Sequence, residues 1–127
     1  MEREQRPLSD LTLAVPNEPL FLAAIGASEI LTGLYYAETP ARRLQREAAI
    51  EAVLEAIPVV PFDLRIARVH AQLWVELGRS GMRIGANDLL IAATAIAHGL
   101  GVLTENLRDF GRVPGLEVRK PQWPKRA

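Results

Sequence analysis

The chain of 127 residues is long enough for one domain, which would bury about 65% of the surface that its unfolded form exposes. Fifteen basic and fifteen acidic residues cancel, so no overall field would draw the protein to nucleic acid or to a membrane, and RNA binding would need local charge or a metal. Hydrophobic residues make up 49%, which is unlike a disordered chain, and the absence of cysteine excludes disulfides and thiolate metal sites. With no signal peptide and no apolar run long enough to span a bilayer, the sequence predicts a soluble cytoplasmic protein without a membrane partner.

The first part of the chain contains one clear strand followed by a helix. Residues 1–18 are mixed and interrupted by proline, so they form a poorly defined start. Residues 20–25 are a continuous apolar run, which is typical of a strand covered on both faces in a parallel sheet. Helical spacing begins at about Gly26 and places Glu29 on a helix that packs against this strand. A carboxylate there needs an explanation, because Glu is rarely buried unless it is paired.

Two further helices and a short strand are predicted next. Thr39 is an N-cap followed by a proline in the first helical position, which predicts a helix over residues 40–56. Residues 59–60 lie between two prolines and predict a short strand near a sheet edge. Asp63 is expected to cap a helix that ends at Leu77. The apolar side chains expected to face the core from the helix over residues 40–56, and from the residue that follows it, are Leu44, Ala48, Ile50, Val53, Leu54 and Ile57.

The rest of the chain is organised around residues 84–110. Asn87 is predicted to be a helix N-cap, and Asp88 lies in the first turn, where the helix dipole favours a carboxylate. The helix that follows carries almost only apolar side chains, so it is expected to be buried. Gly99 supplies a left-handed stop, and residues 102–104 predict a short interior strand followed by an acidic loop.

Strands and helices alternate along the chain, which predicts an α/β fold with a mainly parallel sheet. A last strand is expected over residues 116–118, followed by a basic, proline-broken tail over residues 119–127. The sequence contains no internal repeat and no low-complexity segment. Residues 1–127 are therefore expected to form a single domain.

Four polar side chains are expected at one edge of the sheet, because sites in parallel sheets form beyond the carboxyl ends of the strands. Glu29 follows the first strand, Asn106 and Asp109 follow a later one, and Asp88 begins the helix before that later strand. The three acids among them would then face one crevice. Such hard oxygen ligands suit Mg²⁺ or Mn²⁺, which hold phosphates and activate water for phosphodiester cleavage.

Each of these residues also has an ordinary structural explanation. Asp88 would complement a helix dipole, Asp109 would accept hydrogen bonds from backbone amides in a loop, and Glu29 would be a solvated helix-surface residue. Neither His70 nor His98 lies in a polar cluster, so the sequence offers no comparable arrangement for nucleophilic catalysis. The joint placement of the acids therefore carries more weight than any one of them.

Three blocks of the sequence form a recognisable combination, and they are Ser28 to Gly33, Asn87 to Ala95, and Leu103 to Phe110 together with Val113 to Val118. Their order and spacing cover the chain from about residue 19 to residue 118. Together these blocks resemble PIN-domain ribonucleases, and within that family the VapC-like toxins of bacterial toxin-antitoxin pairs.

The resemblance assigns roles residue by residue. Glu29 and Asp88 match the second and third family acids, which hold the metal. Asn106 matches the position after the last inner strand, and Asp109 matches the acid often found before Phe. The family also opens with an apolar strand that ends in a metal-binding Asp, and this chain departs from that pattern because Asp10 does not follow such a strand. The expectation is a chain start placed about fifteen residues too late for a βα unit of ordinary length.

The resemblance implies a PIN-like three-layer sandwich around a mainly parallel central sheet, with the N-terminal strand missing. It implies a metal-dependent endoribonuclease toxin that uses Mg²⁺ or Mn²⁺, takes RNA as substrate and is neutralised by a cognate antitoxin. A neutral domain with an exposed apolar groove beside an acidic site also suits a homodimer that receives an antitoxin segment. Arg83, Arg108 and Arg112 border the crevice in this interpretation and would contact RNA phosphates, unless they are only solvated surface. The alternative is a non-catalytic PIN-like binding module.

The missing strand has its own consequence. In the resembled fold it lies at the centre of the sheet, so its absence would leave backbone groups of residues 20–25 and 102–104 unpaired, each at a cost of about 1–3 kcal/mol. The two strands would pair with each other, recruit residues 10–15, or borrow a strand from a second copy. The expectation is a poorly folded or associated chain with at most weak nuclease activity.

Overall fold

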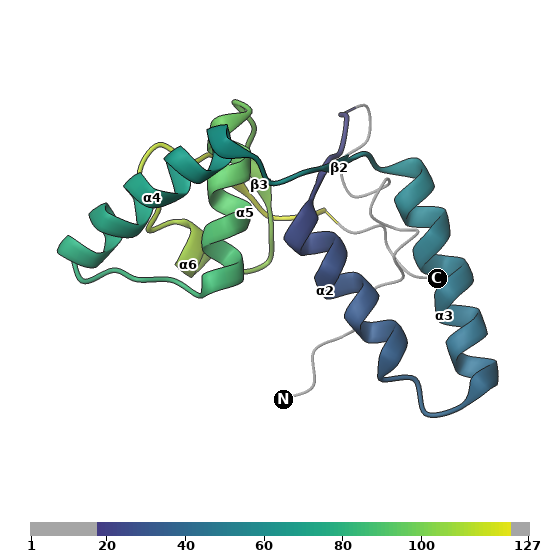
Figure 1. Ribbon diagram of the computed structural model, residues 1–127. Coiled ribbons are helices and arrows are strands. Elements are labelled where there is room, and N and C mark those ends of the chain that lie inside the picture. Colours follow the sequence, from purple (N-terminus) through teal and green to yellow (C-terminus); the bar gives the residue numbers. More distant parts are fainter. Residues whose placement is uncertain (1–17, 123–127) are drawn as a thin grey trace.

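The computed structural model describes residues 18–122, which fold into helices around short parallel strands (Figure 1). Predictions for residues 1–17 and 123–127 lie outside this described part, including residues 10–15 and most of the basic tail. No helix within residues 18–122 has the length and apolar character that crossing a membrane requires. The helices are α2 (Ala24–Tyr35), α3 (Pro40–Ala56), α4 (Leu64–Arg79), α5 (Ala86–Ala97) and α6 (Leu107–Phe110).

The strands form two parallel pairs. β1 (Leu22–Ala23) pairs with β2 (Val59–Val60), and β3 (Val102–Leu103) pairs with β4 (Val118–Arg119). The predicted α/β class and the parallel pairing are confirmed. Within the described residues the two pairs are not hydrogen-bonded to each other, so β1 and β3 have not closed the sheet directly.

Local signals placed several elements correctly. α3 begins at Pro40 as predicted, because the Thr39 hydroxyl accepts a hydrogen bond from the Arg42 amide at 3.2 Å. Asp63 caps α4 in the same way, accepting from the Ile66 amide at 2.9 Å. Gly99 has φ of 66°, so the left-handed stop after α5 is confirmed.

Other boundaries were predicted wrongly. β1 covers two residues rather than the six of the predicted strand, and α2 begins at Ala24. Its partner β2 is equally short, because Pro58 and Pro61 flank it and lack the amide hydrogens that would extend the ladder. Asn87 is not the N-cap of α5. Gly85 takes that position without a side-chain hydrogen bond, so the helix starts at Ala86.

The hydrophobic core lies between α4 and α5 and beneath β3. Several buried members on α5 are alanines, which allow the neighbouring helix and strand to approach closely. We call residues 64–122, which contain this core, the packed lobe. Its buried members are Ile66, Leu73, Leu77, Leu89, Ala92, Ala93, Ala95, Ala97, Val102, Phe110 and Val113.

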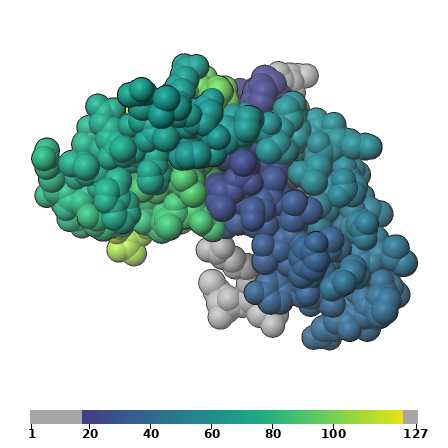
Figure 2. Space-filling view, in the orientation of Figure 1, coloured from purple at the N-terminus to yellow at the C-terminus, as the bar shows by residue number. Residues whose placement is uncertain are grey.

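Helices α2 and α3 form an antiparallel hairpin that projects away from the packed lobe (Figures 1 and 2). The predicted core stripe of α3 is correct at Ile50, Val53 and Ile57, which are buried. It is wrong at Leu44, which is 69% exposed, and at Ala48, which is also exposed. From the first turns of α3, Arg43 and Arg46 make the contacts with α2 that the predicted stripe had assigned to apolar residues.

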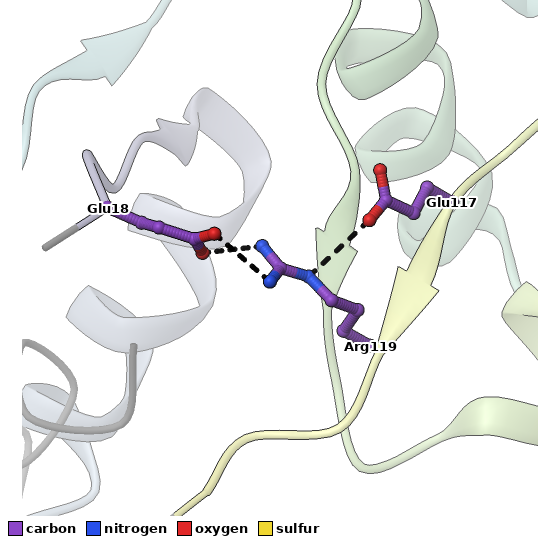
Figure 3. Close-up of polar contacts among 3 residues, drawn as sticks. All are labelled: Glu18, Glu117 and Arg119. Atoms are coloured by element: carbon purple, nitrogen blue, oxygen red, sulfur yellow. Dashed lines mark hydrogen bonds and ion pairs between the residues drawn. The ribbon is translucent and has the colours of Figure 1, made fainter. Parts of the chain in front are cut away.

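A cavity of about 450 Å³ separates the two strand pairs, and both β1 and β3 line it. At its rim, Glu18 and Arg119 form a two-pronged ion pair, with Arg119 Nη1 3.1 Å from Glu18 Oε1 and Nη2 2.5 Å from Oε2 (Figure 3). Glu117 adds a second acidic neighbour, 3.6 Å from Arg119 Nε. The hydrogen bond from Arg119 lowers the pKa of Glu18 and the same contact raises the pKa of Arg119. This ion pair connects the chain entering β1 to β4.

Candidate metal centre

The structure brings together three of the four predicted site residues. Asp88 lies in the first turn of α5, Asn106 is the N-cap of α6, and Asp109 lies within α6. Asn106 Nδ2 donates a hydrogen bond to Asp109 Oδ2 at 3.1 Å. The start of α5 and the segment after β3 therefore present two carboxylates and one amide to the same space, which we call the acid cluster.

The loop that holds Asn106 is fixed by its neighbours. The Thr104 hydroxyl accepts a hydrogen bond from the Asn106 amide at 2.9 Å, and the side chain of Phe110 is only 3% exposed in the core. The predicted acidic loop is in fact a short helix that this buried ring anchors. Sequence reasoning did not assign a role to Thr104, although a hydroxyl two residues before Asn is a known turn signal.

The acid cluster is electrostatically unfavourable when both carboxyl groups are ionised. Partial burial raises the pKa of Asp88, the negative charge of Asp109 raises it further, and hydrogen bonding from Asn106 acts in the opposite direction. Ionising Asp88 therefore costs more in the folded protein than in water, because the carboxylate is partly buried and lies beside Asp109. A cation between the two carboxylates would relieve this repulsion.

Glu29 is not joined to the acid cluster. Its side chain is exposed on α2, and no interaction described for residues 18–122 connects it to Asp88, Asn106 or Asp109. The reason lies in the helix geometry, because Ala27 is the buried residue of α2 and two further positions rotate a side chain by about 200°. The convergence of three acids that the topology predicted is therefore incomplete in this structure.

The three predicted RNA-binding arginines differ in their surroundings. Arg112 lies beside the acid cluster, with Nη1 3.9 Å from Asp109 Oδ1 and donating to the Arg83 carbonyl at 3.2 Å. The guanidinium of Arg83 lies 3.9 Å from the ring centroid of Trp74, so it is stacked on α4. Arg108 is exposed on α6. Only Arg112 is placed to act directly at the cluster.

The donor set of the acid cluster suits a hard divalent cation, since every available ligand atom is an oxygen. Within residues 18–122, however, no three His, Cys, Asp or Glu side chains are gathered closely enough to hold a metal ion. Asp88 and Asp109 supply two carboxylates, and Asn106 directs its amide nitrogen toward them as a hydrogen-bond donor. The cluster is therefore a fitting but partial ligand set.

A family model places this arrangement in context. Residues 2–116 match the model of the PIN domain. The chain belongs to the PIN-domain family. Ribonucleases of this family generally depend on a divalent metal, which agrees with the oxygen donors of the acid cluster.

Within this family, the chain is similar in sequence to VapC ribonucleases and in fold to a solved VapBC structure. The chain is 36% identical to Ribonuclease VapC1 of Rickettsia felis over 98 residues, which cover 77% of this chain and 73% of that protein. It is 33% identical to the tRNA(fMet)-specific endonuclease VapC of Salmonella typhimurium over 97 residues, covering 76% and 71%. The fold is similar to that of VapBC2 from Rickettsia felis bound to a DNA fragment from its promoter, with a TM-score of 0.78, 26% identity, and coverage of 90% of this chain and 84% of the other.

Proposed function

We propose that this protein is a VapC-like endoribonuclease toxin that hydrolyses RNA phosphodiester bonds and is paired with a cognate antitoxin. The observation that carries the proposal is the acid cluster, in which α5 and α6 hold Asp88 and Asp109 within electrostatic reach of each other. The similarity to VapC ribonucleases over about three quarters of the chain supports the same reaction class.

Glu29 and Asp88 are proposed as metal ligands, with Asn106 and Asp109 completing the catalytic group. Mg²⁺, or Mn²⁺ in its place, would supply charge neutralisation at the scissile phosphate and a more acidic water when bound. The chain's own contribution is to hold the carboxylates in fixed positions through the first turn of α5 and the anchored α6. Glu29, which is exposed on α2, would contribute a further carboxylate.

The surrounding arginines would orient the substrate. Arg112 lies close enough to Asp109 to contact a phosphate that enters the acid cluster, while Arg83 and Arg108 would contact phosphates farther along the strand. Arg112 also donates to the Arg83 carbonyl, so its guanidinium is held in place before RNA arrives. Such positioning lowers the entropy lost when the substrate binds.

The proposed protein partner is inferred from solved structures that are similar to this chain. Several solved structures similar to this chain are VapBC complexes, and a cognate antitoxin that covers the acid cluster is proposed here on that basis. A homodimer and a cytoplasmic location are proposed with it. Co-expression with a candidate antitoxin, followed by size-exclusion chromatography with light scattering, tests the assembly.

RNA cleavage by the purified protein tests the function. We expect cleavage with Mg²⁺ or Mn²⁺, none with EDTA, and a loss of roughly a hundredfold or more in Asp88→Asn and Glu29→Gln proteins. Glu55→Gln, an exposed acid on α3, is the matched control and should retain activity. RNA binding without cleavage under any metal condition would instead favour the non-catalytic binding module.

A further inference from the structure

The end of the α2–α3 hairpin carries two neighbouring aromatic side chains that are largely exposed. Tyr35 is 70% exposed and Tyr36 is 76% exposed. The backbone there is held, because the Ala37 amide donates to the Leu34 carbonyl at 3.3 Å. Large aromatic side chains usually contribute to burial, so two adjacent exposed ones on an ordered turn indicate a binding surface.

Arginines from the first turns of α3 flank these rings. The guanidinium of Arg43 lies 5.5 Å from the ring centroid of Tyr35, which is within cation–π distance. Arg46 Nη1 donates to the Gly33 carbonyl at 2.8 Å, which fixes its side chain along α2. Arg42 is 3.8 Å from Glu38, whereas no ion pair described within residues 18–122 includes Arg43 or Arg46. The hairpin end therefore combines flat aromatic faces with positive charge that is not neutralised by those ion pairs.

We propose that this hairpin end binds single-stranded RNA, with an unstacked base on Tyr36 or Tyr35 and a phosphate on Arg43. Single-strand binding sites combine exposed aromatic faces with cationic side chains, and stacking tolerates any base sequence. An aliphatic partner surface would require a continuous apolar patch, but here Leu44 is the exposed aliphatic neighbour on α3. An acidic peptide would use the arginines and leave the aromatic faces without a role.

The position on the hairpin fits the substrate of the proposed function, on which this inference rests. Tyr36 follows Glu29 by seven positions along α2, which corresponds to about 10 Å along a helix axis. In Figure 1 the α2–α3 turn lies at the lower right, apart from the lobe that carries α4, α5 and α6. The hairpin end would therefore hold a part of the RNA strand away from the reacting phosphate and add affinity without touching that phosphate.

RNA binding without catalysis tests the inference. Fluorescence anisotropy with a labelled single-stranded RNA in EDTA measures Kd for the full chain and for Tyr36→Ala, Arg43→Ala, Tyr36→Phe and Leu44→Ala proteins. We expect Kd to rise about fivefold or more in Tyr36→Ala, which loses a stacked base, and in Arg43→Ala, which loses a phosphate contact. Tyr36→Phe keeps the aromatic face, and Leu44→Ala changes an exposed neighbour, so both should stay within about twofold of the wild type.

Three results would overturn the inference. They are an unchanged Kd in both Tyr36→Ala and Arg43→Ala, an equal weakening in Leu44→Ala, and no RNA binding by the wild type. A changed oligomeric state with unchanged RNA affinity would mark the hairpin end as a protein contact and also count against it. The proposed function fails separately, because it requires cleavage that disappears in Asp88→Asn, whereas this binding assay contains no metal and needs no cleavage.

Discussion

Helices α3 and α4 are nearly equal in length, at 17 and 16 residues, yet they serve different purposes. In α4 the buried residues are Ile66, Leu73 and Leu77, spread over most of the helix, because α5 covers one whole side of it. In α3 the buried residues Ile50 and Val53 lie in its second half, and its first half carries exposed arginines. The packed lobe therefore contains most of the hydrophobic core together with the acid cluster, while the first half of α3 in the hairpin is mainly exposed.

A matched pair of leucine truncations should show this contrast most strongly. Leu77 is 2% exposed in α4 and Leu44 is 69% exposed in α3. Because a buried leucine leaves a cavity when shortened, Leu77→Ala should lower the free energy of unfolding by about 2–5 kcal/mol. Leu44→Ala should change it by less than about 0.5 kcal/mol. Urea denaturation measures both, and equal losses would contradict the division into lobe and hairpin.

The two helix caps should show the same contrast on a smaller scale. Asp63 caps α4 in a partly buried setting, and Thr39 caps α3 at the exposed end of the hairpin. Replacing a cap with alanine typically lowers stability by about 0.5–2 kcal/mol. We expect Asp63→Ala to fall in the upper part of this range and Thr39→Ala in the lower part. The reverse order in thermal denaturation would show that hairpin formation limits stability.

Asp88 provides a pH-dependent contrast within the packed lobe. Its folded-state pKa is raised, so the folded state releases this proton less readily than the unfolded state, and stability falls as pH rises from the unfolded pKa through the folded one. Above that window, in EDTA, Asp88→Asn should therefore have a higher Tm than the wild type. Below the window the difference should vanish. A lower Tm for Asp88→Asn at neutral pH would mean that the ionised carboxylate stabilises α5 by more than partial burial and the charge of Asp109 destabilise it.

The smallest change in thermal stability is expected when the ion pair between Glu18, just before β1, and Arg119 in β4 is removed. Both Glu18 and Arg119 are exposed, so salt should screen their attraction. Arg119→Ala should lower Tm slightly at low ionic strength and hardly at all in concentrated NaCl. A large loss that persists in high salt would show that this contact holds the cavity between the strand pairs closed.

Local signals in the sequence predicted the helices better than the sheet. Thr39 and Asp63 act within three residues of themselves, so their caps could be read from neighbouring positions. The pairing of β1 with β2 depends on residues far apart in sequence, and its length was limited by prolines on the partner strand. No local pattern could show that β1 and β3 remain apart.

In the candidate site, too, the residues placed by local signals were predicted better than the residue whose position depends on helix packing. Asp88 was placed in the first turn of α5 correctly because helix-start signals are local, and the short Asn106-to-Asp109 spacing kept those two side chains near each other. The position of Glu29 depends on how α2 is rotated against α5, which hydrophobic spacing in α2 defined poorly, since its buried residue is a single alanine. Its role in metal binding therefore remains a prediction.

Calorimetric titration with Mn²⁺ tests the claim that the acid cluster binds a metal most directly. We expect the wild type to bind Mn²⁺ and the Asp88→Asn and Asp109→Asn proteins to bind it at least about tenfold more weakly, with Glu55→Gln unchanged. Glu29→Gln reports whether α2 contributes a ligand. Equal Mn²⁺ affinity in the wild type and in both aspartate variants would contradict the account.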